Sequence, residues 1–159
     1  MIRVELSVVI PAPLPEVFAY ASDWRKWDEW YVGVSDFLSV NETTQGNGAQ
    51  YAYKARLACF SATVVTEIID YAENVGWKGI GRRGMRHATY WHFEAVGDQT
   101  RFTHTVEGQV PIPVLGALID AVLLRPQWHR IVADSLANLR RHFEALKIPG
   151  APATTHDGA

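Results

Sequence analysis

The feature that most constrains the fold is a series of β-rich segments between residues 36 and 109, joined by connections too short to hold a helix. Turn-forming pairs such as Glu73-Asn74 and Gly97-Asp98 separate the segments. Parallel strands need crossover connections of a dozen residues or more, so we expect these strands to pair antiparallel. The predicted strands lie near residues 36–41, 49–58, 60–70, 75–81, 87–96 and 100–109.

Another strand and two short helices are expected before this series. Residues 2–10 begin with alternating apolar and polar side chains, which is typical of a strand. Pro15 and Glu16 then favour the start of a short helix, because proline and an acidic residue both suit a first helical turn. Asp23 is expected to help cap a second short helix that ends at Trp30.

The C-terminal part of the chain predicts one long helix over residues 127–146. Apolar side chains recur there at three- and four-residue spacing, which gives one apolar stripe. The stripe consists of Trp128, Val132, Leu136, Leu139 and Phe143. A shorter helix over 114–125 is expected before it, with a break or kink at Pro126. We expect one domain over residues 1–148 and a flexible tail over residues 149–159.

Seven strands, two short helices after the first strand and one long C-terminal helix define an α+β fold. The sheet and the helix each have one apolar face and need each other for burial. A strongly twisted sheet can curl around a single helix and leave part of its concave side unfilled. We therefore expect a seven-stranded antiparallel sheet that is curled around the C-terminal helix, with a cavity between them.

Two segments resemble a known family. The stretch "APLPEVFAYASDWRKWDEW" is similar to the segment after the first strand in the polyketide cyclase/dehydrase-like branch of the START-like (SRPBCC) superfamily. The matching residues are Ala12, Pro13, Val17, Phe18, Asp23 and Trp27. The stretch "GDQTRFTHTVEG" is similar to the hairpin near the last strand of that branch. The matching residues there are Gly97, Thr100, Arg101 and Phe102.

This resemblance covers residues 2–146 and implies a helix-grip fold with a deep pocket between the sheet and the C-terminal helix. Members of the superfamily bind or transform lipids, sterols, polyketides and plant hormones, and others serve as cochaperone domains. The fold alone does not choose among these activities.

Aromatic residues are the main candidates for a ligand site. The chain has six tryptophans, and three of them fall within residues 24–30. We expect Trp27 and Trp30 to form part of a wall or lid and Trp24 to pack structurally. Strand parity predicts that Thr89, Trp91 and Phe93 point inward from one strand. It predicts the same for Val75 and Trp77 on the strand before it. The candidate ligand-binding residues are Trp27, Trp30, Tyr53, Trp77, Trp91, Phe93, Phe102, His104, Trp128 and Val132. Ordinary core filling is the alternative for each of them.

His104 is the candidate catalytic residue, because histidine titrates near neutral pH and strand parity places it on the apolar face. The alternative is a core histidine satisfied by a tyrosine hydroxyl or by water. The segment 81–87 carries three arginines, Arg82, Arg83 and Arg86, which could bind a ligand carboxylate at a rim. A solvated turn is the alternative interpretation of that segment.

Several function classes are not expected. The formal net charge of −2 provides no basic surface for nucleic acid. The histidines show no metal-ligand spacing, no phosphate-binding glycine loop is present, and we expect neither a metal nor a cofactor. Arg3 and Glu5 interrupt the first apolar run, so a secretion signal is not expected. No segment reaches the roughly 18 apolar residues of a membrane span. A lone cysteine, Cys59, fits a cytoplasmic location.

Three functions remain open. The leading hypothesis is a cytoplasmic carrier or sensor of a small hydrophobic molecule such as a lipid, a sterol or an aromatic polyketide. The second is an aromatase/cyclase or dehydratase in which His104, Tyr53 and an arginine such as Arg56 or Arg86 move protons or polarise a carbonyl. The third is a protein-interaction module. The sequence does not determine the oligomeric state, and a homodimer is one option.

Overall fold

A computed structural model of the protein describes residues 1–57, 60–109, 122 and 124–147. The strands are β1 (Ile2–Ile10), β2 (Val34–Ser39), β3 (Gln50–Leu57), β4 (Phe60–Ala72), β5 (Gly76–Arg83), β6 (Arg86–Val96) and β7 (Gln99–Gln109). The helices are α1 (Leu14–Ser22), the 3-10 helix η1 (Trp24–Lys26), α2 (Trp27–Trp30) and α4 (Arg125–Leu146). The predicted tail, Cys59 and most of the predicted helix 114–125 lie outside the described residues.

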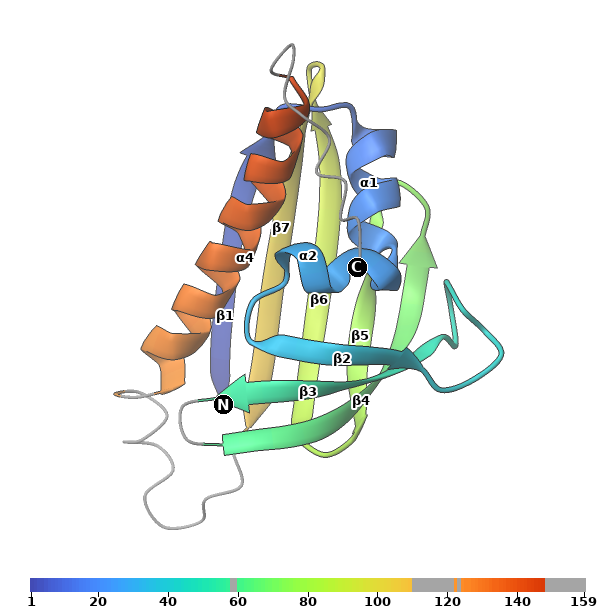
Figure 1. The fold of residues 1–159 in the computed structure, drawn as a ribbon, viewed down its shortest axis with the longest axis vertical. Helices are drawn as coiled ribbons and strands as arrows, with labels where there is room; N and C mark the ends of the chain where they lie inside the picture. The colour runs from blue at the N-terminus through green and yellow to red at the C-terminus, as the bar shows by residue number, and fades with distance from the viewer. Residues whose placement is uncertain (58–59, 110–121, 123, 148–159) are drawn as a thin grey trace, which may run out of the picture.

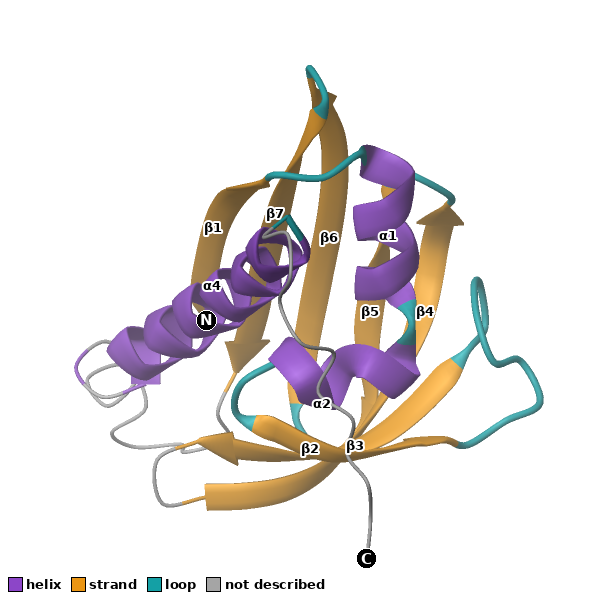
Figure 2. Ribbon diagram, turned by 45° about the horizontal axis from the view of Figure 1, so that its top comes forward, coloured by secondary structure: helices purple, strands orange, loops and turns teal. Residues whose placement is uncertain are grey.

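The seven strands form one antiparallel sheet in the order β1-β7-β6-β5-β4-β3-β2. Strands β2 to β7 are a meander, and β1 pairs with β7 from Ile2 opposite Gly108 to Ile10 opposite Thr100. The sheet bends strongly, so that β2 and β3 cross below α2 (Figure 1). Helices α1, α2 and α4 lie on one side of the sheet (Figure 2). The predicted α+β helix-grip fold is confirmed.

Strand β2 differs from its predicted bounds for two local reasons. Its register with β3 shifts within the segment that contains Asp36, whose φ is 57°, so the strand contains a bulge. The predicted strand includes Asn41, which forms a turn instead. The side-chain amide of Asn41 donates a hydrogen bond to the carbonyl oxygen of Gly48 at 2.8 Å. Side-chain bonds of this kind compete with strand pairing, and β2 ends two residues before Asn41.

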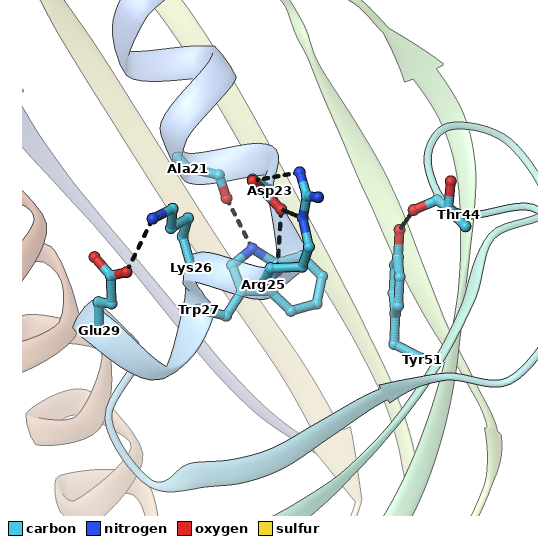
Figure 3. A network of polar contacts seen from close by, with 8 residues as sticks. All are labelled: Ala21, Asp23, Arg25, Lys26, Trp27, Glu29, Thr44 and Tyr51. Carbon is cyan, nitrogen blue, oxygen red and sulfur yellow. Dashed lines mark hydrogen bonds and ion pairs between the residues drawn. The ribbon is translucent and has the colours of Figure 1, made fainter. Parts of the chain in front are cut away.

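The two predicted short helices are present, with the 3-10 turn η1 between them. Pro15 lies in the first turn of α1. Asp23 caps η1, because its carboxylate accepts a hydrogen bond from the backbone N–H of Arg25 at 3.1 Å (Figure 3). The indole N–H of Trp27 donates to the carbonyl oxygen of Ala21 at 2.8 Å and is buried. These bonds orient α2 and turn the Trp27 ring toward the sheet.

Helix α4 buries the predicted apolar stripe against the sheet. All five stripe residues are at most 5% exposed: Trp128, Val132, Leu136, Leu139 and Phe143. The helix packs along β1, the edge strand, and comes close to β7 at one point. A Cβ atom on Gly108 of β7 would lie 2.1 Å from Cη2 of Trp128. The six-membered ring of Trp128 therefore occupies the space that any other residue at position 108 would need.

The prediction that Val75 points inward is wrong. Val75 precedes β5 and is 49% exposed. Its backbone N–H donates to the carbonyl oxygen of Ala72 at 3.0 Å and so closes the turn between β4 and β5. The next residue, Gly76, has a φ of 145°, and a Cβ there would lie 1.9 Å from the carbonyl oxygen of Trp91. The strand parity therefore starts after the turn, with Trp77 buried as expected.

The contact between Gly108 and Trp128 leads to a prediction about stability. Gly108→Ala is expected to lower the free energy of unfolding by about 1–3 kcal/mol, because the added methyl group overpacks the ring of Trp128. In a Trp128→Phe background the same substitution should cost much less, since phenylalanine lacks the atoms that clash. Urea unfolding of the four variants measures both costs. Equal costs in the two backgrounds would show that this contact does not set the helix position.

Candidate functional site

A partly open cavity of about 70 Å³ lies on the inner side of the sheet, lined by residues of α4, of strands β2 and β3 at one end of the sheet, and of strands β6 and β7. Its apolar wall includes Val34, Ala55, Val106, Trp128, Ile131 and Val132. Its polar lining consists of Tyr31, Tyr53, Arg56, His87 and Thr89. A mainly apolar concave site with a few polar groups is typical of a small-molecule binding pocket.

A second cavity of about 30 Å³ lies deeper, under α2. Aromatic side chains form most of its wall, among them Trp27, Phe37, Tyr51, Trp77 and Trp91. The two cavities share Tyr31, Tyr53 and Thr89, which we call the partition. These three residues are all that the two linings have in common, so they lie between the two spaces.

A hydrogen-bonded group, which we call the His87 cluster, lies at the partition. It consists of Tyr53 from β3, Thr66 from β4 and His87 from β6. Nε2 of His87 is 2.8 Å from Oγ1 of Thr66 and 3.1 Å from the hydroxyl oxygen of Tyr53, and the two hydroxyl oxygens are 2.9 Å apart. Nδ1 of His87 is 2.9 Å from the carbonyl oxygen of Met85. A carbonyl only accepts, so Nδ1 carries the proton and Nε2 is the acceptor.

The cluster is electrically neutral near pH 7. Burial lowers the pKa of His87, and the hydrogen bond to the Met85 carbonyl only partly opposes this effect. Burial also raises the pKa of the Tyr53 hydroxyl to about 12, against a smaller opposing effect of its hydrogen bond with Thr66. The charged forms of both side chains are therefore disfavoured, and the cluster presents neutral hydrogen-bonding groups to the cavity.

His104, the candidate catalytic residue, is fully buried and lines neither described cavity. Its Nε2 is 3.4 Å from the hydroxyl oxygen of Tyr31, which does line both cavities. Its Nδ1 has no hydrogen-bond partner among the described residues. Burial lowers the pKa of His104 to about 3, so the imidazole is neutral at physiological pH. A catalytic role for His104 stays a prediction, and its position fits a core histidine.

The structure brings six of the predicted ligand-binding residues to the cavities. Tyr53, Trp128 and Val132 line the larger cavity. The smaller cavity is lined by Trp27, Tyr53, Trp77 and Trp91. Trp24 is only partly buried and packs against Tyr51, with ring centroids 5.9 Å apart.

The other aromatic candidates lie in the packed interior. Phe93 and Phe102 stack with centroids 4.4 Å apart, and Trp30 is 1% exposed and contacts Trp91. None of these three lines a described cavity. Their contact with a ligand stays a prediction. The three tryptophans of residues 24–30 thus have different surroundings: Trp30 packs in the core, Trp24 covers it, and Trp27 lines a cavity.

The predicted anion-binding arginines lie at the hairpin between β5 and β6. Arg82, Arg83 and Arg86 are exposed and line neither described cavity. Arg82 pairs with Glu67, with Nε and Oε2 2.9 Å apart. Anion binding by the three residues therefore stays a prediction. The arginine that does line the larger cavity is Arg56, near the end of β3.

Sequence reasoning missed three polar residues of the site, Tyr31, Thr66 and His87. Thr66 lies in a strand with Val or Ile on both faces, so parity did not indicate its direction. His87 has the same strand parity as Thr89 and Trp91, so the alternation along β6 would have placed it on the inner face. Tyr31 follows α2 directly, and no periodic signal marks it. Its hydroxyl is buried, which raises its pKa. The position of Tyr31 depends on the route of the chain from α2 to β2.

Within residues 1–57, 60–109, 122 and 124–147 no three side chains of His, Cys, Asp or Glu gather in a way that could hold a metal ion. The helices in the same part of the chain include none that is long and apolar enough to cross a membrane.

The fold and its cavity define a START-like helix-grip protein. The sequence profile of the family described as "Polyketide cyclase / dehydrase and lipid transport" matches residues 1–144. The chain therefore belongs to this family. A search of curated proteins found no match.

Solved structures share the fold. The protein TTHA0849 from Thermus thermophilus superposes with a TM-score of 0.79 at 21% identity, over 92% of this chain and 99% of that one. A START superfamily protein from Mycobacterium smegmatis superposes with a TM-score of 0.74 at 15% identity, over 91% of this chain and 98% of that one. At this level of identity the likeness concerns the fold alone.

The buried position of His104 leads to a prediction about pH. Because its pKa is lowered in the folded protein, the unfolded chain takes up a proton near pH 6.5 that the folded chain does not. Stability is therefore full above pH 6.5 and falls as the pH is lowered toward 3, by up to about 1.4 kcal/mol per pH unit. His104→Phe should flatten this dependence in urea unfolding between pH 6.5 and 5.

The matched control is His92→Phe, because His92 is exposed on the neighbouring strand β6. It should keep the slope of the wild-type protein. A residual slope in His104→Phe is expected from His87, whose pKa is also lowered. If His104→Phe and the wild-type protein had the same slope, His104 would not be the buried neutral group described above.

Proposed function

We propose that the protein binds a small hydrophobic ligand in the cavity between the sheet and α4. The observation that supports this most is the apolar wall of the larger cavity, to which α4 contributes Trp128, Ile131 and Val132 and the sheet contributes Ala55 and Val106. Burial of apolar ligand surface against such a wall provides the driving force for binding. The family description, which names lipid transport, supports the same proposal.

The size of the cavity limits how much of a ligand enters. Water occupies roughly 30 Å³ per molecule in the liquid, and an apolar cavity of about 150 Å³ holds benzene. The larger cavity, at about 70 Å³, accommodates the end of a ligand rather than a whole sterol or lipid. The remainder of a larger ligand would lie outside the partly open mouth, or the partition would move and add the space of the second cavity.

Acid–base catalysis is a second candidate function, and one observation favours it. His87 and Tyr53 line the cavity and hydrogen-bond to each other, so they could transfer a proton to or from a bound molecule. The family description also names cyclases and dehydrases. In this alternative His87, rather than His104, would act as the acid or base, and Arg56 at the cavity would polarise a carbonyl group.

Other expectations from the sequence stay predictions. A cytoplasmic location rests on the single Cys59, which lies outside the described residues. Docking of a partner protein rests on the exposed Arg82, Arg83 and Arg86. A homodimer rests on no contact that the structure describes.

A ligand titration tests the proposal. Butylbenzene and octanoic acid are titrated into the protein while tryptophan fluorescence is recorded, because Trp128 lines the larger cavity. We expect saturable binding with one site. Ala55→Leu should weaken it by about tenfold or more, since the larger side chain occupies the cavity. Native mass spectrometry of protein purified from its own host would show whether a ligand travels with it.

The matched control is Ala137→Leu, on the exposed face of α4, which should leave binding unchanged. Circular dichroism confirms that each variant is folded. If neither probe nor any other small hydrophobic molecule saturates the wild-type protein, the proposal fails. If Ala55→Leu binds as tightly as the wild-type protein, the ligand lies elsewhere.

A further inference from the structure

The His87 cluster joins three strands across a strand that has no side chains at that place. Thr66 on β4 and His87 on β6 are separated by β5, yet Oγ1 and Nε2 are only 2.8 Å apart. Strand β5 has Gly81 opposite Thr66, and a Cβ on Gly81 would lie 2.5 Å from Nδ1 of His87. A Cβ on Gly79 would likewise lie 2.9 Å from Cγ2 of Thr66. The two glycines therefore clear the space in which the cluster forms.

Every hydrogen-bonding proton of the cluster already has an acceptor in the protein. The Nδ1 proton of His87 goes to the carbonyl oxygen of Met85. The two hydroxyl protons of Tyr53 and Thr66 have the acceptors Nε2 and one hydroxyl oxygen, at 2.8 to 3.1 Å. The hydroxyl oxygens of Tyr53 and Thr66 still have lone pairs that can accept a further hydrogen bond. A ligand carbonyl would have to break one of these bonds, whereas a ligand hydroxyl would add a bond.

Tyr53 is the member of the cluster that a ligand in either cavity can reach. It lines both cavities, whereas Thr66 lines only the smaller one and His87 only the larger one. The ligand group that contacts Tyr53 must also be compatible with a site that is neutral and mainly apolar. A buried carboxylate would find no positive group within the cluster. Arg56 lines the larger cavity, but it is exposed to solvent and takes no part in the hydrogen bonds described for the cluster.

On the basis of the proposed function, we propose that the end of the ligand inside the cavity carries a neutral hydroxyl group, which donates a hydrogen bond to the hydroxyl oxygen of Tyr53. The ligand class is thus an alcohol on a narrow apolar chain, which suits a cavity of about 70 Å³. The His87 cluster is the part of the site that selects it over a hydrocarbon or a carboxylic acid of the same shape.

Three narrow probes of matched shape test this inference: 1-pentanol, hexane and pentanoate. Isothermal titration calorimetry at pH 7 gives the dissociation constant of each. We expect 1-pentanol to bind about fivefold more tightly than hexane, because it adds one hydrogen bond to the same apolar contact. We expect pentanoate to bind more weakly than 1-pentanol, since its charge would be desolvated beside a neutral cluster.

Two substitutions locate the effect. Tyr53→Phe removes the proposed acceptor and should bring the preference for 1-pentanol over hexane to about one, while hexane binds as before. Tyr90→Phe is the matched control, because it also removes one tyrosine hydroxyl but lies on β6 outside both described cavities. In that variant the preference for 1-pentanol should persist.

The outcomes separate the two proposals. If no probe binds, the proposed function fails and the inference fails with it. If 1-pentanol and hexane bind equally to the wild-type protein, or if pentanoate binds most tightly, the ligand site stands and the inference is wrong. It is also wrong if Tyr53→Phe keeps the preference, or if Tyr90→Phe loses it.

Discussion

The packing of one helix into a bent sheet is the constraint on which the rest of the structure depends. A single apolar stripe on α4 is buried against the inner face, and the helix packs along β1, at one edge of the sheet. One helix is too narrow to cover seven strands. The short helices α1 and α2 cover another part of the inner face with aromatic side chains. The larger cavity lies where α4 faces strands β2, β3, β6 and β7, and no residue of α1 or α2 lines it.

The contents of that inner face differ along the sheet. Near α1, Phe18 packs edge-to-face on Phe93 and Trp77, with centroids 5.2 and 5.8 Å apart, and the interior there is dense. Toward the start of α4 the wall changes to Ala55, Val106 and a few polar groups. The dense part stabilises the fold through its apolar contacts. The part near the start of α4 has smaller side chains, so a cavity remains there in which a ligand could bind.

Much of the fold could be predicted from the sequence because its signals are local. Alternation along β1 and β7 and the spacing of the α4 stripe each depend on the period of a single element. The same rule predicted that His104 points inward, and it does. It did not predict whether that side chain meets a ligand or the core, because parity gives the face of a strand and not what fills the space in front of it.

The sequence by itself determined the order of the elements, the antiparallel meander and the residues that α4 buries, since these follow from short-range periodicity and short connections. Tertiary structure decided which aromatics pack and which line a cavity, how large the cavities are, and that Tyr53, Thr66 and His87 form one cluster. That cluster depends on the register of four adjacent strands and on two glycines in β5. Register and sheet curvature are set by contacts between residues far apart in the chain, so no local pattern specifies them.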